Sequence, residues 1–366
     1  MTLIKVKSRG TDNVTGRKNI LYNGAMQIHQ RGNTTTASGS SKYFVDRFNV
    51  FSNGSEAVAN LQQSTDVPSG NGFAKSLLID VTTAESSVAA SEIAVLRQIM
   101  EGYDLQQLQY GASSARPVTL SFWVKSPKAG THICELWHFT SPVRTQSQSY
   151  TVSSANTWEK HSVTFSGDTA TALDNDSNYT MAVQWGLFAG TNYTSGTLAT
   201  SWQNSGDTNR YVGQQNLFDN TSNNFYLTGA QLEVGNSVSD FEHRSYGEEF
   251  SLCKRYYEEI SPANSTYYGV GSVSSGGSSP TVIGQVSWDL EKRGTPAVTY
   301  SGTPGSHFGV TRAGSSNAGM GTITFGNINK RNCYIQSASS PSAMTTGYAT
   351  VLNITGSGKI MINAEI

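Results

Sequence analysis

The chain has 366 residues, of which 14% are charged, and its formal net charge is −1. Such a charge creates no basic field for nucleic acid, and no apolar run approaches the roughly 18 residues of a membrane span. The length suggests two domains, and the 17 Tyr and 14 Phe exclude a disordered chain. Short aromatic segments between Gly, Ser and Asn turns predict an all-β protein.

Residues 1–19 form a short polar segment with one candidate strand, in which Ile4 and Val6 alternate with lysines. A single strand without a hairpin partner is not stable alone. The segment therefore either stays flexible or attaches to another protein by adding a strand to its sheet. It lacks the apolar stretch of a secretory signal, so we expect a protein made in a cytoplasm and released by lysis.

Residues 20–247 predict one large β domain. Its pattern is clearest at residues 118–124, where apolar side chains alternate with others and share one face. About eight strands separated by polar loops are typical of a two-sheet jelly roll. The candidate strands are Tyr43–Phe51, Ser76–Val81, Pro117–Lys125, Thr131–Phe139, Ser149–Val152, Glu159–Phe165, Asn178–Leu187 and Asn224–Glu233.

A long polar loop at residues 191–224 carries side chains that suit sugar recognition. Sugars stack their flat C–H faces on tyrosine and tryptophan rings, while arginine can hydrogen-bond their hydroxyls. Tyr193, Trp202, Arg210 and Tyr211 are therefore candidate glycan-binding residues. The alternative is that these rings pack the loop onto the sandwich, since long ordered loops pack on their own side chains.

One helix is expected, at residues 246–260, and we take residues 248–261 as a connector between the two domains. Glutamates at its start suit the helix dipole, and Pro262 ends it. Its apolar stripe has helical spacing and consists of Phe250, Cys253, Tyr257 and Ile260.

Residues 262–366 predict a smaller C-terminal β-sandwich that forms a tip domain. His307 and Phe308 are flanked by glycine and proline, as in an exposed loop, and are further candidate glycan contacts. If the N-terminus anchors the protein, the C-terminus is its far end, where adaptable loops would contact a receptor. The candidate strands are Thr281–Leu290, Ala297–Tyr300, Gly321–Phe325, Cys333–Ser337, Ala349–Ile354 and Ile360–Ala364.

No catalytic or cofactor motif is complete, so we predict a protein that is not an enzyme. The nucleophile elbow and the zinc-protease motif are absent, and the three distant cysteines are expected to be buried free thiols. Residues 174–178 resemble half of a calcium loop without its glycine and glutamate, which favours a solvated turn over a calcium site. Among carboxylates that could cleave a glycan, Glu101 and Asp104 could approach each other near a turn.

Several blocks of the sequence carry a family resemblance. They read RKNILYNGAMQIHQRG at residues 17–32 with YFVDRF at 43–48, RQIMEGYD at 97–104 with SFWVKS at 121–126, and FYLTGAQLEVG at 225–235 with FEHR at 241–244 and LCKRYY at 252–257. In order and spacing they resemble tail-fibre-like virion proteins of bacterial viruses, many from marine phages. A weaker match covers RGTPAVT at residues 293–299 and the terminal AEI at 364–366.

The resemblance implies a carbohydrate-binding-module-like jelly roll followed by a variable C-terminal β domain. It further implies a homotrimeric appendage on the outside of the virion, joined to other virion proteins through residues 1–19, which recognises a host-surface glycan during adsorption. Two alternatives stay open: a capsid or tail decoration protein with a purely structural role, and a glycan depolymerase. Such jelly rolls often hold a structural calcium ion through an Asp in the last strand. Residues 226–229 (YLTG) lack this Asp, so calcium is left open and no other cofactor is expected.

Overall fold

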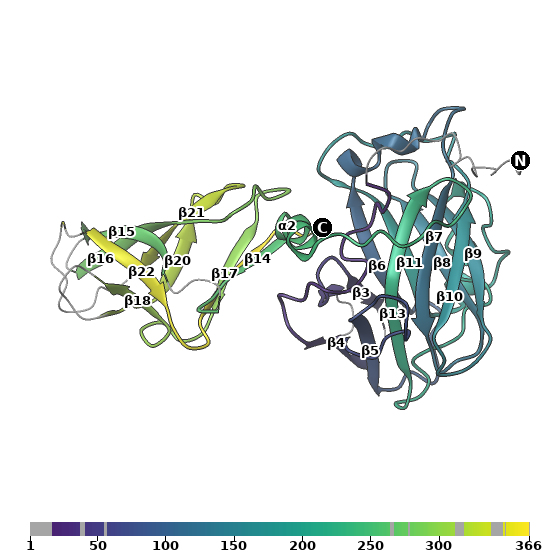
Figure 1. The fold of residues 1–366 in the computed structure, drawn as a ribbon, viewed down its shortest axis with the longest axis horizontal. Coiled ribbons are helices and arrows are strands. Elements are labelled where there is room, and N and C mark those ends of the chain that lie inside the picture. Colours follow the sequence, from purple (N-terminus) through teal and green to yellow (C-terminus); the bar gives the residue numbers. More distant parts are fainter. Residues whose placement is uncertain are drawn as a thin grey trace, which may run out of the picture.

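The computed structural model of the chain consists of two β-sheet parts, and a short helix lies at the junction between them (Figure 1). The structure describes residues 17–36, 41–54, 57–263, 267–276, 279–311, 318–337, 347 and 349–365. The strand expected around Ile4 and Val6 lies outside these residues. Strands form most of the regular structure in both parts, so the predicted all-β class is confirmed. Within the described ranges, no helix is long and apolar enough to cross a membrane.

The larger part is a sandwich of two antiparallel sheets around one apolar core. Strand β11 lies between β6 and β8, and β13 lies between β5 and β7, which are the crossovers of the predicted jelly roll. The first sheet contains, in spatial order, β1 (Thr34–Thr35), β4 (Val58–Ser64), β5 (Ser76–Thr83), β13 (Asn224–Val234), β7 (Val118–Lys125) and β10 (Glu159–Phe165). The second contains β12 (Gln203–Asn204), β9 (Arg144–Val152), β8 (Gly130–His138), β11 (Tyr179–Ala189), β6 (Ile93–Glu101), β3 (Asn49–Asn53) and β2 (Ser41–Tyr43).

The alternation predicted in β7 builds the core between the sheets. Val118, Leu120, Phe122 and Val124 are all fully buried. The Phe122 ring meets the Trp185 ring of the opposite sheet edge to face, with 5.7 Å between centroids. Burial of each such side chain contributes on the order of 1.5–3 kcal/mol to folding. The pattern of one strand therefore specifies which face of its sheet turns inward.

The sandwich also contains strands that the sequence pattern does not predict. Strand β6 is buried on both faces along most of its length, so it shows an apolar run rather than alternation. The single strand predicted at residues 43–51 is divided into β2 and β3. Between them Arg47 is buried and has a φ of 74°, a left-handed conformation that interrupts a strand.

The predicted connector helix is shorter than its sequence pattern suggests. Helix α2 spans Tyr246–Lys254 and is capped by Ser245, whose side chain accepts a hydrogen bond from the backbone of Glu248. Residues 257–260 form strand β14 (Tyr257–Ile260) instead of a fourth helical turn. They pair with the last strand of the chain. The apolar stripe is therefore divided between a helix and a strand, because sheet pairing overrides the local helical pattern.

The smaller part packs two sheets around its own core. Its glycine-rich strand β15 is not predicted, since glycine weakens the strand pattern. The first sheet orders β14, β23 (Lys359–Asn363) and β17 (Ala297–Ser301). The second orders β19 (Ala318–Gly319), β18 (Phe308–Thr311), β22 (Ala349–Ile354), β15 (Tyr267–Gly276), β16 (Ser279–Ser287), β21 (Asn332–Ser337) and β20 (Ile323–Gly326).

The end of the chain returns to the junction between the two parts. Figure 1 shows the C-terminus beside α2, and the penultimate residue Glu365 forms ion pairs with Arg31 and Arg47 of the sandwich. A second bridge joins Arg255 to Glu101 through two hydrogen bonds of 2.7 Å. Strand β23 runs back toward the sandwich, so the last described residues lie at the junction while the body of the smaller part extends away from it (Figure 1).

Candidate functional site

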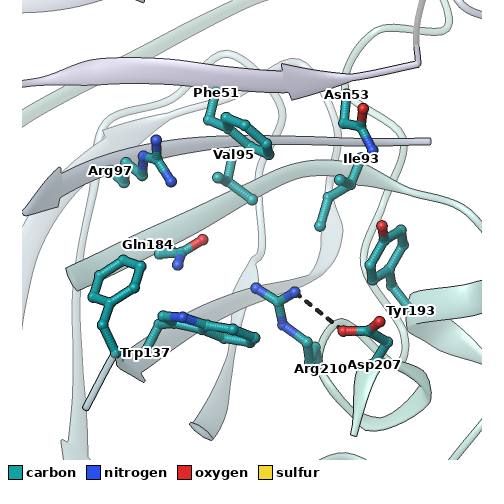
Figure 2. A pocket seen from close by; sticks show the side chains of 11 residues that line it. Phe51, Asn53, Ile93, Val95, Arg97, Trp137, Gln184, Tyr193, Asp207 and Arg210 are labelled. Carbon is teal, nitrogen blue, oxygen red and sulfur yellow. Dashed lines mark ion pairs between the residues drawn. The ribbon is translucent and has the colours of Figure 1, made fainter. Parts of the chain in front are cut away.

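A pocket of about 310 Å³ lies on the outer face of the seven-stranded sheet of the sandwich (Figure 2). Its floor comes from strands β3, β6, β11 and β8. Its rim comes from the loop that contains the short helices α1 (Thr191–Thr194) and η3 (Asp207–Asn209). The residues that line it are Phe51, Asn53, Ile93, Val95, Arg97, Trp137, Phe139, Gln184, Tyr193, Asp207 and Arg210.

Strand register places these side chains next to one another. Across the sheet, Gln184 of β11 pairs with Arg97 of β6, which pairs in turn with Asn49 of β3. One pleat further along, Val95 pairs with Phe51. Because side chains two residues apart point to the same face, a polar row and an apolar row lie side by side at the pocket.

The charge on Arg210 is held in place by a buried carboxylate. Its Nε and Nη2 atoms donate to the two carboxylate oxygens of Glu135, each over 2.9 Å. The hydroxyl of Tyr211 donates to the same carboxylate over 2.7 Å. The guanidinium carbon lies 3.7 Å from the centroid of the Trp137 ring. Burial opposes the charge, but Glu135 raises the pKa of Arg210 above its ordinary value.

On the opposite wall, Arg97 has a different environment. Its Nε atom donates to the side-chain oxygen of Asn49 over 3.0 Å, and its guanidinium carbon lies 4.6 Å from the centroid of the Phe51 ring. Burial lowers the pKa of Arg97 below its ordinary value. Figure 2 shows the guanidinium at the end of the pocket away from Asp207.

The candidates from the long loop separate into three environments. Tyr193 and Arg210 line the pocket. Trp202 lies elsewhere, with its indole N–H donating to the backbone oxygen of Ser166 over 2.6 Å and its ring edge-on to Tyr110. Tyr211 is fully buried. Its assignment as a glycan contact is therefore corrected, because a side chain without exposed surface anchors the loop instead.

The candidates in the smaller part do not form an exposed binding tip. Phe308 is 1% exposed and belongs to the core, so its assignment as a glycan contact is also corrected. His307 is half-buried in a turn, where its Nδ1 atom accepts a hydrogen bond from the backbone of Thr303 over 2.7 Å. Glycines let the chain pass close to His307, since a Cβ at Gly302 would lie 3.1 Å from its Nδ1 atom and one at Gly358 would lie 2.9 Å from its Cβ.

Most of the pocket residues are missed by reasoning from the sequence. Phe51, Arg97 and Trp137 are on the outward face of their strands, and they come from three separate segments. The available signal was alternation, since Trp137 lies between the inward-facing Leu136 and His138. Alternation identifies an outward side chain, but not which outward side chains of other strands lie beside it.

A second hollow of about 280 Å³ lies on the six-stranded sheet, beside Trp123, Phe73 and Phe241. Its charged side chains within the described residues, Lys160 and Asp240, are both exposed. No charge there is held by burial in the way that Glu135 holds Arg210. The pocket on the seven-stranded sheet of the sandwich, where Glu135 holds Arg210, is therefore the better-organised site.

The structure describes no group of three or more potential metal ligands among its placed residues. Residues 174–178 instead satisfy one another and their neighbours. Asp174 accepts a hydrogen bond from the hydroxyl of Thr140, and Asp176 accepts two from Asn178. All three cysteines are buried free thiols, as predicted.

No protein-family model matches the sequence, and no curated protein matches it. Solved structures show low similarity. The enzymatically active domain of tailspike protein 4 from bacteriophage CBA120 is 11% identical, with a TM-score of 0.29 over 59% of this chain and 21% of that one. This chain thus spans about a fifth of that tailspike chain. A putative sugar binding protein from Bacteroides thetaiotaomicron is 11% identical, with a TM-score of 0.34 over 59% of this chain and 100% of that one. The family 11 carbohydrate-binding module of a Clostridium thermocellum cellulase is 14% identical, with a TM-score of 0.25 over 56% and 98%.

Proposed function

We propose that this chain is a non-enzymatic glycan-binding protein and that it binds its ligand in the pocket on the seven-stranded sheet of the sandwich. The observation that carries the proposal is the mixture of side chains around one hollow. The half-buried rings of Phe51, Trp137 and Tyr193 share it with the polar groups of Arg97 and Gln184. Sugars need both an apolar surface for their C–H faces and fixed polar groups for their hydroxyls.

The polar side of the pocket is organised before any ligand arrives. Gln184 is 3% exposed, and its side-chain amide lies 3.1 Å from the hydroxyl oxygen of Tyr211. Arg210 is fixed between Glu135 and the Trp137 ring. Side chains held in this way lose little rotamer entropy on binding, which favours recognition of a weakly interacting ligand such as a sugar.

Replacement of the Tyr193 ring tests the proposal. Tyr193→Ala should weaken glycan binding at least tenfold, because it removes a half-buried stacking surface on the rim while the two hydrogen bonds between Arg210 and Glu135 do not involve Tyr193. The measurement is a glycan array, followed by isothermal titration with the best ligand. Tyr103→Ala is the matched control, since Tyr103 is 57% exposed and lies outside the pocket. If the two variants bind equally well, the pocket is not the glycan site.

We further propose that the chain acts as a tail-fibre-like appendage on the outside of a virion and recognises a host-surface glycan during adsorption. The support is the order and spacing of the family-like blocks across residues 17–260. Recombinant protein on host envelope polysaccharide should bind without releasing reducing ends. The absence of both binding and cleavage would favour a purely structural decoration protein. Cleavage would favour a depolymerase.

A homotrimer is part of this proposal. Val270 is 69% exposed and pairs with Val351 on the neighbouring strand, and Ile283 shares their face of the sheet. An exposed apolar face of this kind suits contact with further copies of the chain. Light scattering should give three times the mass of the chain, and a stable monomer at micromolar concentration would contradict the trimer.

A further inference from the structure

Arg97 is a cation of the pocket whose charge the fold leaves unmatched. Arg210 has Glu135 at 2.9 Å and Asp207 at 3.6 Å. Arg97 forms no ion pair with any carboxylate in the described part of the chain, and its hydrogen bond goes to the neutral Asn49. Its two Nη atoms, with four N–H groups, form no hydrogen bond with those residues.

The surroundings of Arg97 disfavour its charged form. Burial and the like charge of Arg210 both act against the charged form of Arg97, and both lower its pKa. Neighbouring Tyr43 and Tyr211 act in the opposite direction, but neither is a carboxylate. A guanidinium that is partly desolvated and not paired interacts strongly with any anion that reaches it.

The sheet also determines where such an anion would lie. Register places Arg97 directly beside Gln184, whose side chain also lines the pocket. The pocket's own carboxylate, Asp207, is 61% exposed on the rim and lies at the other end (Figure 2). The two ends therefore differ in charge. One suits an anionic group, and the other suits hydroxyl donors.

We propose that the pocket selects an acidic sugar, with a carboxylate or sulfate ester at the Arg97 end accepting hydrogen bonds from the Nη atoms. This inference rests on the proposed glycan-binding function and names its ligand class. A planar guanidinium suits two-point recognition of either anion. The rings of Phe51, beside Arg97, and of Tyr193, at the Asp207 end, would contact the sugar itself (Figure 2).

The test uses the full chain and two matched pairs of polymers. Polygalacturonate is compared with its carboxyl-reduced form, and carrageenan with its desulfated form, by affinity electrophoresis and isothermal titration. The acidic member of at least one pair should bind at least tenfold more tightly than its neutral counterpart. The pair that shows the difference identifies the anion as a carboxylate or a sulfate.

Arg97→Gln should remove this preference, leaving the acidic polymer bound no more tightly than the neutral one. Arg97→Lys should keep part of the preference, since it retains the charge but not the two-point geometry. Arg331→Gln is the control, because it makes the same charge change at an arginine that is 69% exposed in the smaller part. A circular dichroism melt of each variant checks folding.

The outcomes separate the two proposals. Equal affinity for acidic and neutral polymers overturns the acidic-sugar inference and leaves the proposed glycan-binding function intact. An acidic preference that survives Arg97→Gln overturns the role of Arg97. Binding to none of the four polymers also overturns the inference, while the glycan array with Tyr193→Ala decides the proposed function independently.

Discussion

At the scale of single residues, the pocket depends on a buried charge. Glu135 is fully buried, and its carboxylate accepts hydrogen bonds from Arg210, Tyr211 and Thr145. The sequence identifies Arg210 as a polar loop residue with a candidate role. It does not identify its partner, because Glu135 lies 75 positions earlier in a strand. Long-range ion pairs leave no trace in local periodicity.

Glu135→Gln should destabilise the protein by about 3–5 kcal/mol, since it leaves the buried Arg210 guanidinium without its anion. The measurement is urea unfolding at pH 7, with tryptophan fluorescence as the signal. Glu291→Gln makes the same substitution at an ion pair with exposed partners, where a loss below about 1 kcal/mol is expected. Equal losses in the two variants would mean that burial of the Glu135 pair adds nothing to stability.

At the scale of elements, the sequence pattern predicts the strands that have one solvent-exposed face. Strand β10 is an example, because Val163 and Phe165 turn inward while Ser162 and Thr164 turn outward. Strand β6 escapes prediction because both of its faces are covered. The last four residues of the predicted helix become β14 because their backbone finds a partner in β23. Local pattern thus succeeds where one side of an element meets water and fails where tertiary pairing supplies the hydrogen bonds.

At the scale of the whole molecule, the two parts are joined by buried charge rather than by a simple linker. Arg47 is 1% exposed, pairs with Glu365 and stacks on the Tyr256 ring at 3.3 Å. The penultimate residue of the chain therefore stabilises the junction of both parts. This contact orients the smaller part relative to the sandwich and its pocket.

Glu365→Gln should loosen this junction, because it leaves the guanidinium of Arg47 buried beside a neutral amide. We expect a larger radius of gyration by small-angle X-ray scattering and faster release of a sandwich-sized fragment by trypsin. Asp289→Asn is the control near α2, since Asp289 is 70% exposed in its pair with Lys254. An unchanged radius and cleavage rate for Glu365→Gln would show that other contacts hold the two parts together.

The sequence by itself determined the all-β class, the inward faces of strands such as β7, the buried thiols and the position of a helix near residue 246. These features follow from composition, period and capping, which act over a few residues. Only the tertiary structure decided that Phe51, Arg97 and Trp137 surround one pocket, that Tyr211 and Phe308 are buried, and that the chain ends at the junction. Those outcomes depend on strand order and register, which bring distant segments together and are not encoded in any one of them.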